Sequence, residues 1–349
     1  MRKKLLSILF AMSLTASALT GSVLTYGSAV EAVTEGVTEA AVASPITVTD
    51  QIGREVTLEK PAEKIVSCYY LVTSSLLALG ENDRIVGIEN GADARELYHL
   101  AAPEMLDLPG VGSGKEINIE AIADLEPDLV FLPKKQQDVA ETLTDLGIPC
   151  LIVNPETFDT YNEMIELLGT VTGEANAAAD LTSYYDDAVA ELRDLTADVE
   201  TRPSVYLRGS SSYLRAASGG MYQSSMIDIA GGTSVTEEIA SDTWTDISPE
   251  QLADWNPDVI MNVSYSEFTL DDIRTDAALT DLTAVQNDAL YTVPSQIEAW
   301  DYPQPSSILG LYWMTHVLHP ELITEDQYLE KAQEFYKTYF DLDITADQL

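Results

Sequence analysis

The segment EAIADLEPDLVF at Glu120–Phe131 is the strongest indication of the fold, because it returns 130 residues later as EQLADWNPDVIM at Glu250–Met261. Each copy has the pattern of a short amphipathic helix, a Pro-Asp turn and an apolar strand rich in branched residues, which is half of an α/β unit. Two copies in the two halves of a chain of 349 residues indicate two lobes of related α/β architecture. Paired lobes commonly bind a ligand between them, so the repeat predicts an α/β protein with a ligand cleft between its lobes.

The N-terminal residues predict export. The first four residues carry positive charge, a short apolar run follows at 5–14, and small residues suited to cleavage come after it. The apolar run is too short to span a bilayer. The pattern therefore predicts a secretory signal peptide over 1–32 and a flexible tether over 33–45. Ser17 stands where a lipoprotein signal has its lipidated cysteine, so the sequence supports no covalent lipid anchor.

The charge of the chain excludes several classes of partner. Eighteen Lys and Arg residues against 58 Asp and Glu residues give a net charge of −40. This negative field repels nucleic acid and anionic membrane surfaces, so we expect neither nucleic-acid binding nor stable membrane insertion. The three histidines show no metal-ligating spacing, and we expect no metal site and no intrinsic cofactor. Cys68 and Cys150 are the two cysteines, and whether they pair stays open.

The alternation of strand and helix patterns predicts the domain boundaries. We expect an N-terminal α/β lobe over 46–168, a linking helix over 169–200 and a C-terminal α/β lobe over 201–349. Gly173–Asp198 has apolar residues at helical spacing, which predicts a helix of about 25 residues, or roughly 37 Å at 1.5 Å per residue. One long helix between two lobes permits small rocking motions rather than wide hinge closure.

An ordered set of short motifs resembles the helix-backbone class of ABC-transporter substrate-binding proteins. The motifs are KIVS at 64–67, LLALG at 76–80, EPDLVFLP at 126–133, IDIAGG at 227–232 and WDYPQPSSILGLYW at 300–313. The resemblance covers about 46–325. It implies an exported, monomeric receptor, at the periplasmic or extracellular face of the membrane, that captures a scarce nutrient complex and delivers it to an ABC permease with its ATPase.

Aromatic and basic residues at strand ends and in loops are the expected ligand contacts. Aromatic faces with polar tips suit a flat, partly apolar metal complex, and basic side chains suit an anionic chelate. The alternatives are core packing for the aromatic residues and ordinary surface charge for the basic ones. The predicted ligand-binding residues are Tyr69, Tyr70, Lys134, Arg208, Tyr213, Tyr222, Trp244, Trp300 and Tyr302.

Two serines mark a departure from the class. The resemblance implies a Thr-Glu pair at the start of the first helix and a Glu in the helix before AGG, and these acids meet arginines of the permease. The corresponding residues here are Thr73-Ser74 and Ser225. We expect Ser74 and Ser225 at the two docking tips, with Glu81 or Asp228 as possible substitutes for the missing charge.

The sequence predicts a binding protein rather than an enzyme. It has no GxSxG, P-loop or HExxH motif, and no motif places a histidine near a Ser or Cys nucleophile. The resemblance makes a ferric siderophore or related metal chelate the first choice of ligand, with a corrinoid such as cobalamin, or haem, as the alternative and molybdate or tungstate next. A secreted hydrolase and an adhesion or scaffold protein are the alternatives from other functional classes.

Overall fold

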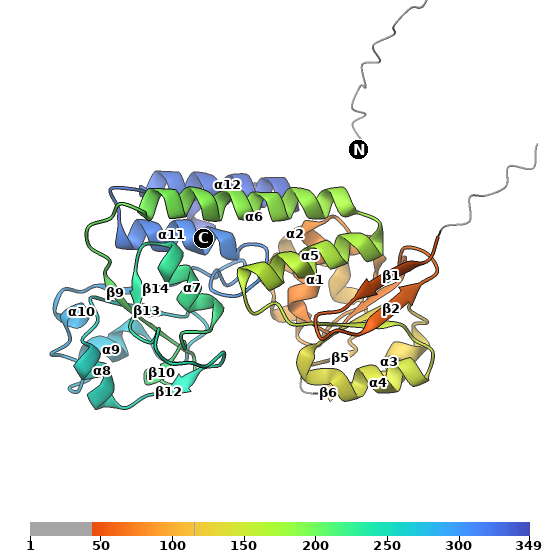
Figure 1. Cartoon of the computed structure of the whole chain (residues 1–349), viewed down its shortest axis with the longest axis horizontal. Coiled ribbons are helices and arrows are strands. Elements are labelled where there is room, and N and C mark those ends of the chain that lie inside the picture. The colour runs from red at the N-terminus through yellow and green to blue at the C-terminus, as the bar shows by residue number, and fades with distance from the viewer. Residues whose placement is uncertain (1–43, 115) are drawn as a thin grey trace, which may run out of the picture. The chain divides into compact units, whose positions relative to one another are not determined.

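The computed structural model describes residues 44–114 and 116–349. The predicted signal peptide and nearly all of the predicted tether lie outside the described residues. The described part of the chain belongs to one compact unit, which contains two α/β lobes, each built around its own sheet (Figure 1). Within these ranges, no helix combines the length and the apolar character that a membrane crossing requires.

The N-terminal lobe has a parallel four-stranded sheet in the order β4-β3-β7-β8, preceded by the antiparallel hairpin β1-β2. Alternate residues of the central strand β7 enter different clusters: Leu129 and Phe131 pack with residues of α1 and α5, whereas Val130 and Leu132 pack with residues of α3 and α4. Both faces of the sheet are therefore covered, which explains its continuous apolar strands. The strands and helices are β1 Ile46–Thr49, β2 Glu55–Leu58, β3 Ile65–Ser67, α1 Tyr70–Ala78, β4 Ile85–Gly87, α2 Glu96–Ala101, β5 Gly112–Ser113, β6 Glu116–Ile117, α3 Ile119–Asp124, β7 Leu129–Pro133, α4 Gln137–Asp145, β8 Cys150–Val153 and α5 Phe158–Thr172.

The C-terminal lobe has a mixed sheet in the order β12-β10-β9-β13-β14, with β11 also paired to β9. Strands β9, β13 and β14 run parallel, and the short strands β10 and β12 add antiparallel pairs at one side. The strands and helices are β9 Ser204–Arg208, β10 Arg215–Ala216, α7 Tyr222–Ile229, β11 Thr233–Ser234, β12 Thr245–Asp246, α8 Pro249–Trp255, β13 Val259–Asn262, α9 Leu270–Thr275, α10 Thr283–Gln286, β14 Leu290–Thr292, α11 Ser307–Leu318 and α12 Glu325–Phe340. Short 3-10 helices cover Asn82–Arg84, Ala92–Ala94, Pro103–Asp107, Lys134–Gln136 and Ala346–Gln348.

The two copies of the repeat have the same local structure. Each copy turns at a residue with positive φ, Glu126 at 46° and Asn256 at 42°, between its helix and its strand. In each copy the aspartate after the proline accepts hydrogen bonds from the backbone at the start of the neighbouring strand. Asp128 accepts hydrogen bonds from the backbone N–H of Glu63 and Lys64 just before β3, and Asp258 accepts one from Ser204 at the start of β9. The repeat thus builds the central strand pair of each lobe.

The linking helix α6 covers Ala175–Thr196, 22 residues, or about 33 Å. The predicted segment 169–200 is therefore too long, because its first four residues complete α5. Gly173 separates the two helices with a φ of 83°, a left-handed conformation that favours glycine. Gly169 of α5 lies so close to Ala178 of α6 that a side chain there would collide. This tight packing requires the chain to bend between the helices.

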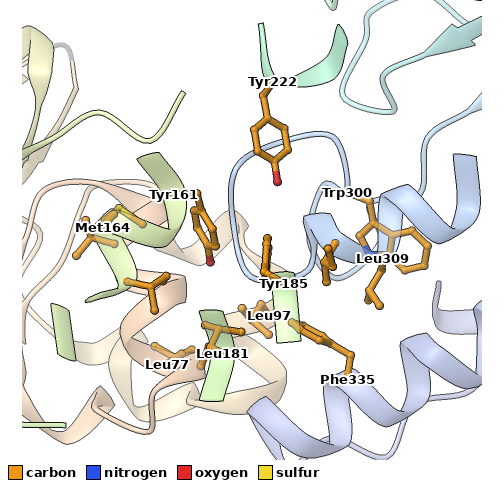
Figure 2. Close-up of a cluster of buried hydrophobic side chains, with 14 of the residues drawn as sticks. Leu77, Leu97, Tyr161, Met164, Leu181, Tyr185, Tyr222, Trp300, Leu309 and Phe335 are labelled. Carbon is orange, nitrogen blue, oxygen red and sulfur yellow. The ribbon is translucent and has the colours of Figure 1, made fainter. Parts of the chain in front are cut away.

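One hydrophobic core continues from lobe to lobe. Phe158 of α5 stacks on Tyr222 of α7, with ring centroids 4.3 Å apart. Tyr185 of α6 donates its hydroxyl toward the carbonyl oxygens of Gln304 and Pro305, at 2.7 and 2.8 Å. Figure 2 shows Tyr185 and Tyr222 among the buried side chains of this core. The lobes are thus held by packed side chains as well as by α6.

Candidate functional site

A cavity of about 440 Å³ lies between the two lobes. The start of α1 and the residues around α2 line it from the N-terminal lobe, and the loop 295–304 lines it from the C-terminal lobe. Ligand pockets typically measure about 300–1,000 Å³. The cavity is therefore large enough for a small ligand, and it lies where the sequence predicts a cleft.

Three tyrosines form an aromatic wall in this cavity. Tyr70 begins α1 directly after β3, and its ring meets that of Tyr302 edge to face, with centroids 6.2 Å apart. Tyr265 lies 5.2 Å from Tyr302, and Tyr69 packs behind Tyr70 at 5.4 Å. The structure thus brings the predicted residues Tyr70 and Tyr302 together from opposite lobes, with Tyr69 supporting them. Their role in binding stays a prediction.

Arg95 lies against this wall. Its guanidinium carbon is 3.9 Å from the centroid of the Tyr70 ring, and its Nε is 3.5 Å from Oε1 of Glu89. Glu89 is buried and accepts hydrogen bonds from the hydroxyls of Thr73, at 2.6 Å, and Tyr98, at 2.8 Å. Burial raises the pKa of Glu89, and these bonds oppose the rise. The charge of Arg95 is therefore already engaged by a carboxylate and an aromatic face.

Two buried carboxyl groups lie in the loop that closes the other side. Burial raises the pKa of Glu298 to about 7 and that of Asp301 to about 6. Asp301 accepts a hydrogen bond of 2.6 Å from the Tyr265 hydroxyl, which couples it to the aromatic wall. Oε2 of Glu298 and Oδ1 of Asp301 have no hydrogen-bond partner among the described residues. The cavity is therefore bounded by carboxylates that are incompletely satisfied.

Two aromatic residues predicted for the cleft are core residues instead. Trp300 is 1% exposed, and its indole Nε1 donates a hydrogen bond of 3.3 Å to the hydroxyl of Tyr336 on α12. Tyr222 is 3% exposed and bonds through its hydroxyl to Ser307 Oγ at 2.8 Å. Figure 2 shows both side chains within the buried cluster. Neither side chain lines the cavity in this structure, because a position near Gly or Pro residues does not say which way a side chain points; their contact with a ligand stays a prediction.

Arg208 is also an internal residue. It is fully buried and donates hydrogen bonds to Asn262 Oδ1 at 2.6 Å, to Ser266 Oγ at 2.9 Å and to the Phe268 carbonyl oxygen at 2.6 Å. These bonds fasten the loop after β13, which carries Tyr265. Arg208 therefore supports the cavity wall from behind, and the expectation that it contacts a ligand directly is corrected.

The other predicted contacts lie away from the cavity lining. Lys134 is exposed at the end of β7. Trp244 is partly exposed and covers Gly209 so closely that a Cβ there would come within 2.8 Å of the ring. Tyr213 is partly exposed, and its ring centroid lies 6.4 Å from that of Phe268. For these three residues ligand contact stays a prediction.

The predicted docking residues differ in exposure. Ser74 is 2% exposed, because α1 is buried along nearly its whole length, and it lies in the lining of the cavity. It therefore presents no surface to a permease, and its assignment to a docking tip is corrected. Ser225 is partly exposed on α7, and Asp228 one turn later forms ion pairs with Arg193 at 3.3 Å and Arg202 at 2.9 Å.

The described residues include two cysteines and no set of side chains placed as the ligands of a metal site. Among the described residues, no group of three or more His, Cys, Asp or Glu side chains is arranged to hold a metal ion. Cys68 and Cys150 are both free and buried. Burial keeps the pKa of the Cys68 thiol well above its usual range.

Sequence reasoning missed four residues of the site. Tyr265 lies three residues beyond the end of β13, and a tyrosine close to the end of a strand is the same signal that indicated Tyr69 after β3. Glu298 and Asp301 flank Trp300, inside or beside a motif that carries the family resemblance. Arg95 lies eight residues beyond the end of β4, and no local pattern distinguishes it from a surface arginine.

Known proteins resemble this chain over most of its length. A family model described as periplasmic binding protein matches residues 65–297. The molybdate-binding protein MolA of Haemophilus influenzae is 24% identical over 329 residues, 86% of this chain and 93% of that protein. A cobalamin-binding protein of Halobacterium salinarum is 27% identical over 221 residues, 62% of this chain and 58% of that protein. The crystal structure of a periplasmic solute binding protein from Veillonella parvula superposes with a TM-score of 0.77 at 25% identity, covering 87% of this chain and 95% of that one.

Proposed function

We propose that this chain, which belongs to the periplasmic binding protein family, captures a metal chelate in the cavity between its lobes and carries out no reaction on it. It is a substrate-binding protein of an ABC importer. The proposal places it outside the cytoplasm, where it would transfer its ligand to a membrane permease that works with an ATPase.

The observation that carries the proposal is the pairing of Tyr70 and Tyr302 across the cavity. The two rings come from different lobes and meet edge to face, with the third ring of Tyr265 beside them. Aromatic side chains supply a large contact area with polar hydroxyl tips. A ligand bound here would touch both lobes at once, so its presence can be read by a permease that contacts both.

The choice of chelate follows from size and charge. A ferric siderophore remains the first candidate, and the cavity of about 440 Å³ has room for the metal centre of a compact complex. Cobalamin is the second candidate, since the relative from Halobacterium salinarum is named for it; a ligand of that size would require the lobes to separate. Haem follows. Molybdate comes last, although it gives the Haemophilus influenzae relative its name, because Arg95 is already paired with Glu89.

Fluorescence titration tests the proposal. Purified protein is titrated with ferric siderophores, haem and cyanocobalamin, and intrinsic fluorescence is recorded. We expect saturable binding of one complex and a loss of at least tenfold in affinity for Tyr302→Ala, because a central interface aromatic typically contributes about 2 kcal/mol or more. Tyr339→Ala, a partly exposed tyrosine on α12, is the matched control. Binding that is unaffected by Tyr302→Ala, or no binding of any complex, would contradict the proposal.

A further inference from the structure

Acidic side chains outnumber basic ones around the interlobe cavity. Among the described residues that line it, Arg95 is the one basic side chain, whereas Glu96 and Glu298 are acidic. Two further acidic residues lie directly behind the lining. Glu89 forms an ion pair with Arg95, and Asp301 accepts a hydrogen bond from the hydroxyl of Tyr265. One guanidinium thus faces two lining carboxyl groups, with two more buried behind them.

Glu298 is the acidic residue of the lining that has a buried oxygen without a hydrogen bond among the described residues. It is 8% exposed, it lines the cavity, and its Oε2 accepts no hydrogen bond from the described residues. Removal of a carboxyl group from water favours its protonated form, and interactions with Ser306, Arg95 and Ser74 oppose that effect here. The rise of its pKa to about 7 has this cause. A guest with positive charge beside this carboxyl group would favour its ionised form.

The aromatic wall already holds a cation. The Arg95 guanidinium lies 3.9 Å from the centroid of Tyr70, within the distance of about 6 Å at which a cation is attracted to a ring face. Nε of Arg95 is itself without a hydrogen bond among the described residues, and its side chain is 38% exposed. The guanidinium therefore occupies a position that a guest cation can take when Arg95 turns toward solvent.

We infer that the interlobe cavity selects a compact cationic metal complex, held by the Glu298 carboxylate and the Tyr70–Tyr302 wall, and that it disfavours oxyanions. The inference rests on the proposed function and narrows its ligand class. An anion site would require a basic group free to receive the anion. Arg95 is instead engaged by Glu89 and Tyr70, and an anion beside it would also face Glu298.

Two variants give opposite results for the two charge classes. Glu298→Gln keeps the shape of the side chain and removes its charge, and Arg95→Met removes the competing cation. For a cationic guest, Glu298→Gln weakens binding and Arg95→Met strengthens it. For an anionic guest, both signs reverse. The sign pattern separates the alternatives even if absolute affinities are modest.

The probes are hexaamminecobalt(III), a trivalent cation with N–H donors, and tris(oxalato)cobaltate(III), a trivalent anion with the same metal. Molybdate is the third probe. Each is titrated by calorimetry at pH 7.5 and 150 mM salt into the wild type and both variants. Because the chain carries a net charge of −40, nonspecific attraction of the cation is measured with Glu330→Gln, which removes an exposed carboxylate on α12.

We expect hexaamminecobalt(III) to bind the wild type, to bind Glu298→Gln at least tenfold more weakly, and to bind Glu330→Gln as it binds the wild type. Arg95→Met should bind it severalfold more tightly. Equal effects of Glu298→Gln and Glu330→Gln would overturn the inference. The inference would also be overturned if an anionic probe bound the wild type, bound Arg95→Met more weakly and bound Glu298→Gln more tightly. That result would leave the proposed function as a chelate receptor intact. If no probe binds, yet a ferric siderophore or corrinoid binds equally to wild type and Glu298→Gln, the inference fails alone; if nothing binds, both fail. Should Arg95→Met not fold, the isosteric Glu298→Gln decides the outcome.

Discussion

Replacing Glu298 with glutamine should make the stability of the ligand-free protein less sensitive to pH. Burial raises the pKa of Glu298 from its usual value near 4.5 to about 7. The folded protein therefore holds the proton more tightly than the unfolded chain. The stability linked to this proton is fully present below about pH 4.5 and is lost as pH rises through about 7. The amide of the variant does not titrate in this range, so the variant has no such loss.

The magnitude follows from the two pKa values. Their difference corresponds to about 3 kcal/mol, at about 1.36 kcal/mol for each tenfold change in proton affinity. Between pH 5 and pH 8, we expect the variant to gain about 2 to 3 kcal/mol in unfolding free energy relative to the wild type. This range also keeps the protein above its isoelectric point near 4.1, where it would tend to aggregate.

Urea denaturation measures the effect. Unfolding is followed by tryptophan fluorescence at several pH values, and the midpoint and the slope m are compared for wild type and variant. Glu330→Gln serves as the exposed control and should show no comparable trend. The amide can change stability by a constant amount, so the trend with pH is the informative quantity. A difference between variant and wild type that stays constant, or falls, from pH 5 to pH 8 would refute the reasoning.

Three further outcomes are expected. Trp300→Ala should lower the unfolding free energy by about 3 to 5 kcal/mol, since it empties a buried site beside Tyr336; a variant as stable as the wild type in urea would show that this side chain is not core. Ligand addition should change the radius of gyration only slightly, because α6 and the shared core hold the lobes, and a large compaction in small-angle scattering would argue against that. The affinity of the protein for its permease should depend only weakly on salt concentration. Ser225→Glu should increase that dependence, and Ser225→Ala, the control, should not. A steep salt dependence of the wild type would mean that other carboxylates contact the permease.

The two-lobed architecture could be predicted from local sequence patterns. The repeated helix, Pro-Asp turn and strand predicted two related lobes, and the structure shows the same positive φ at Glu126 and Asn256 and the same strand contacts from Asp128 and Asp258. These features are local: a turn residue, a capping carboxylate and an apolar strand act within a few residues or on the adjacent strand. Periodicity also predicted the linking helix: the expected Gly173–Asp198 contains the observed α6, Ala175–Thr196, with two further residues at each end.

Which side chains face the cavity depends on packing between segments that are distant in the chain. Trp300 and Tyr302 lie two residues apart in one loop, yet Trp300 bonds to Tyr336 in the core and Tyr302 meets Tyr70 across the cavity. Arg95 looks like any surface arginine until Tyr70 and Glu89 are found beside it. The side of a loop that a residue faces is set by contacts with residues distant in the chain, and no short pattern records them. Local chemistry therefore built the lobes, and long-range packing between them made the site.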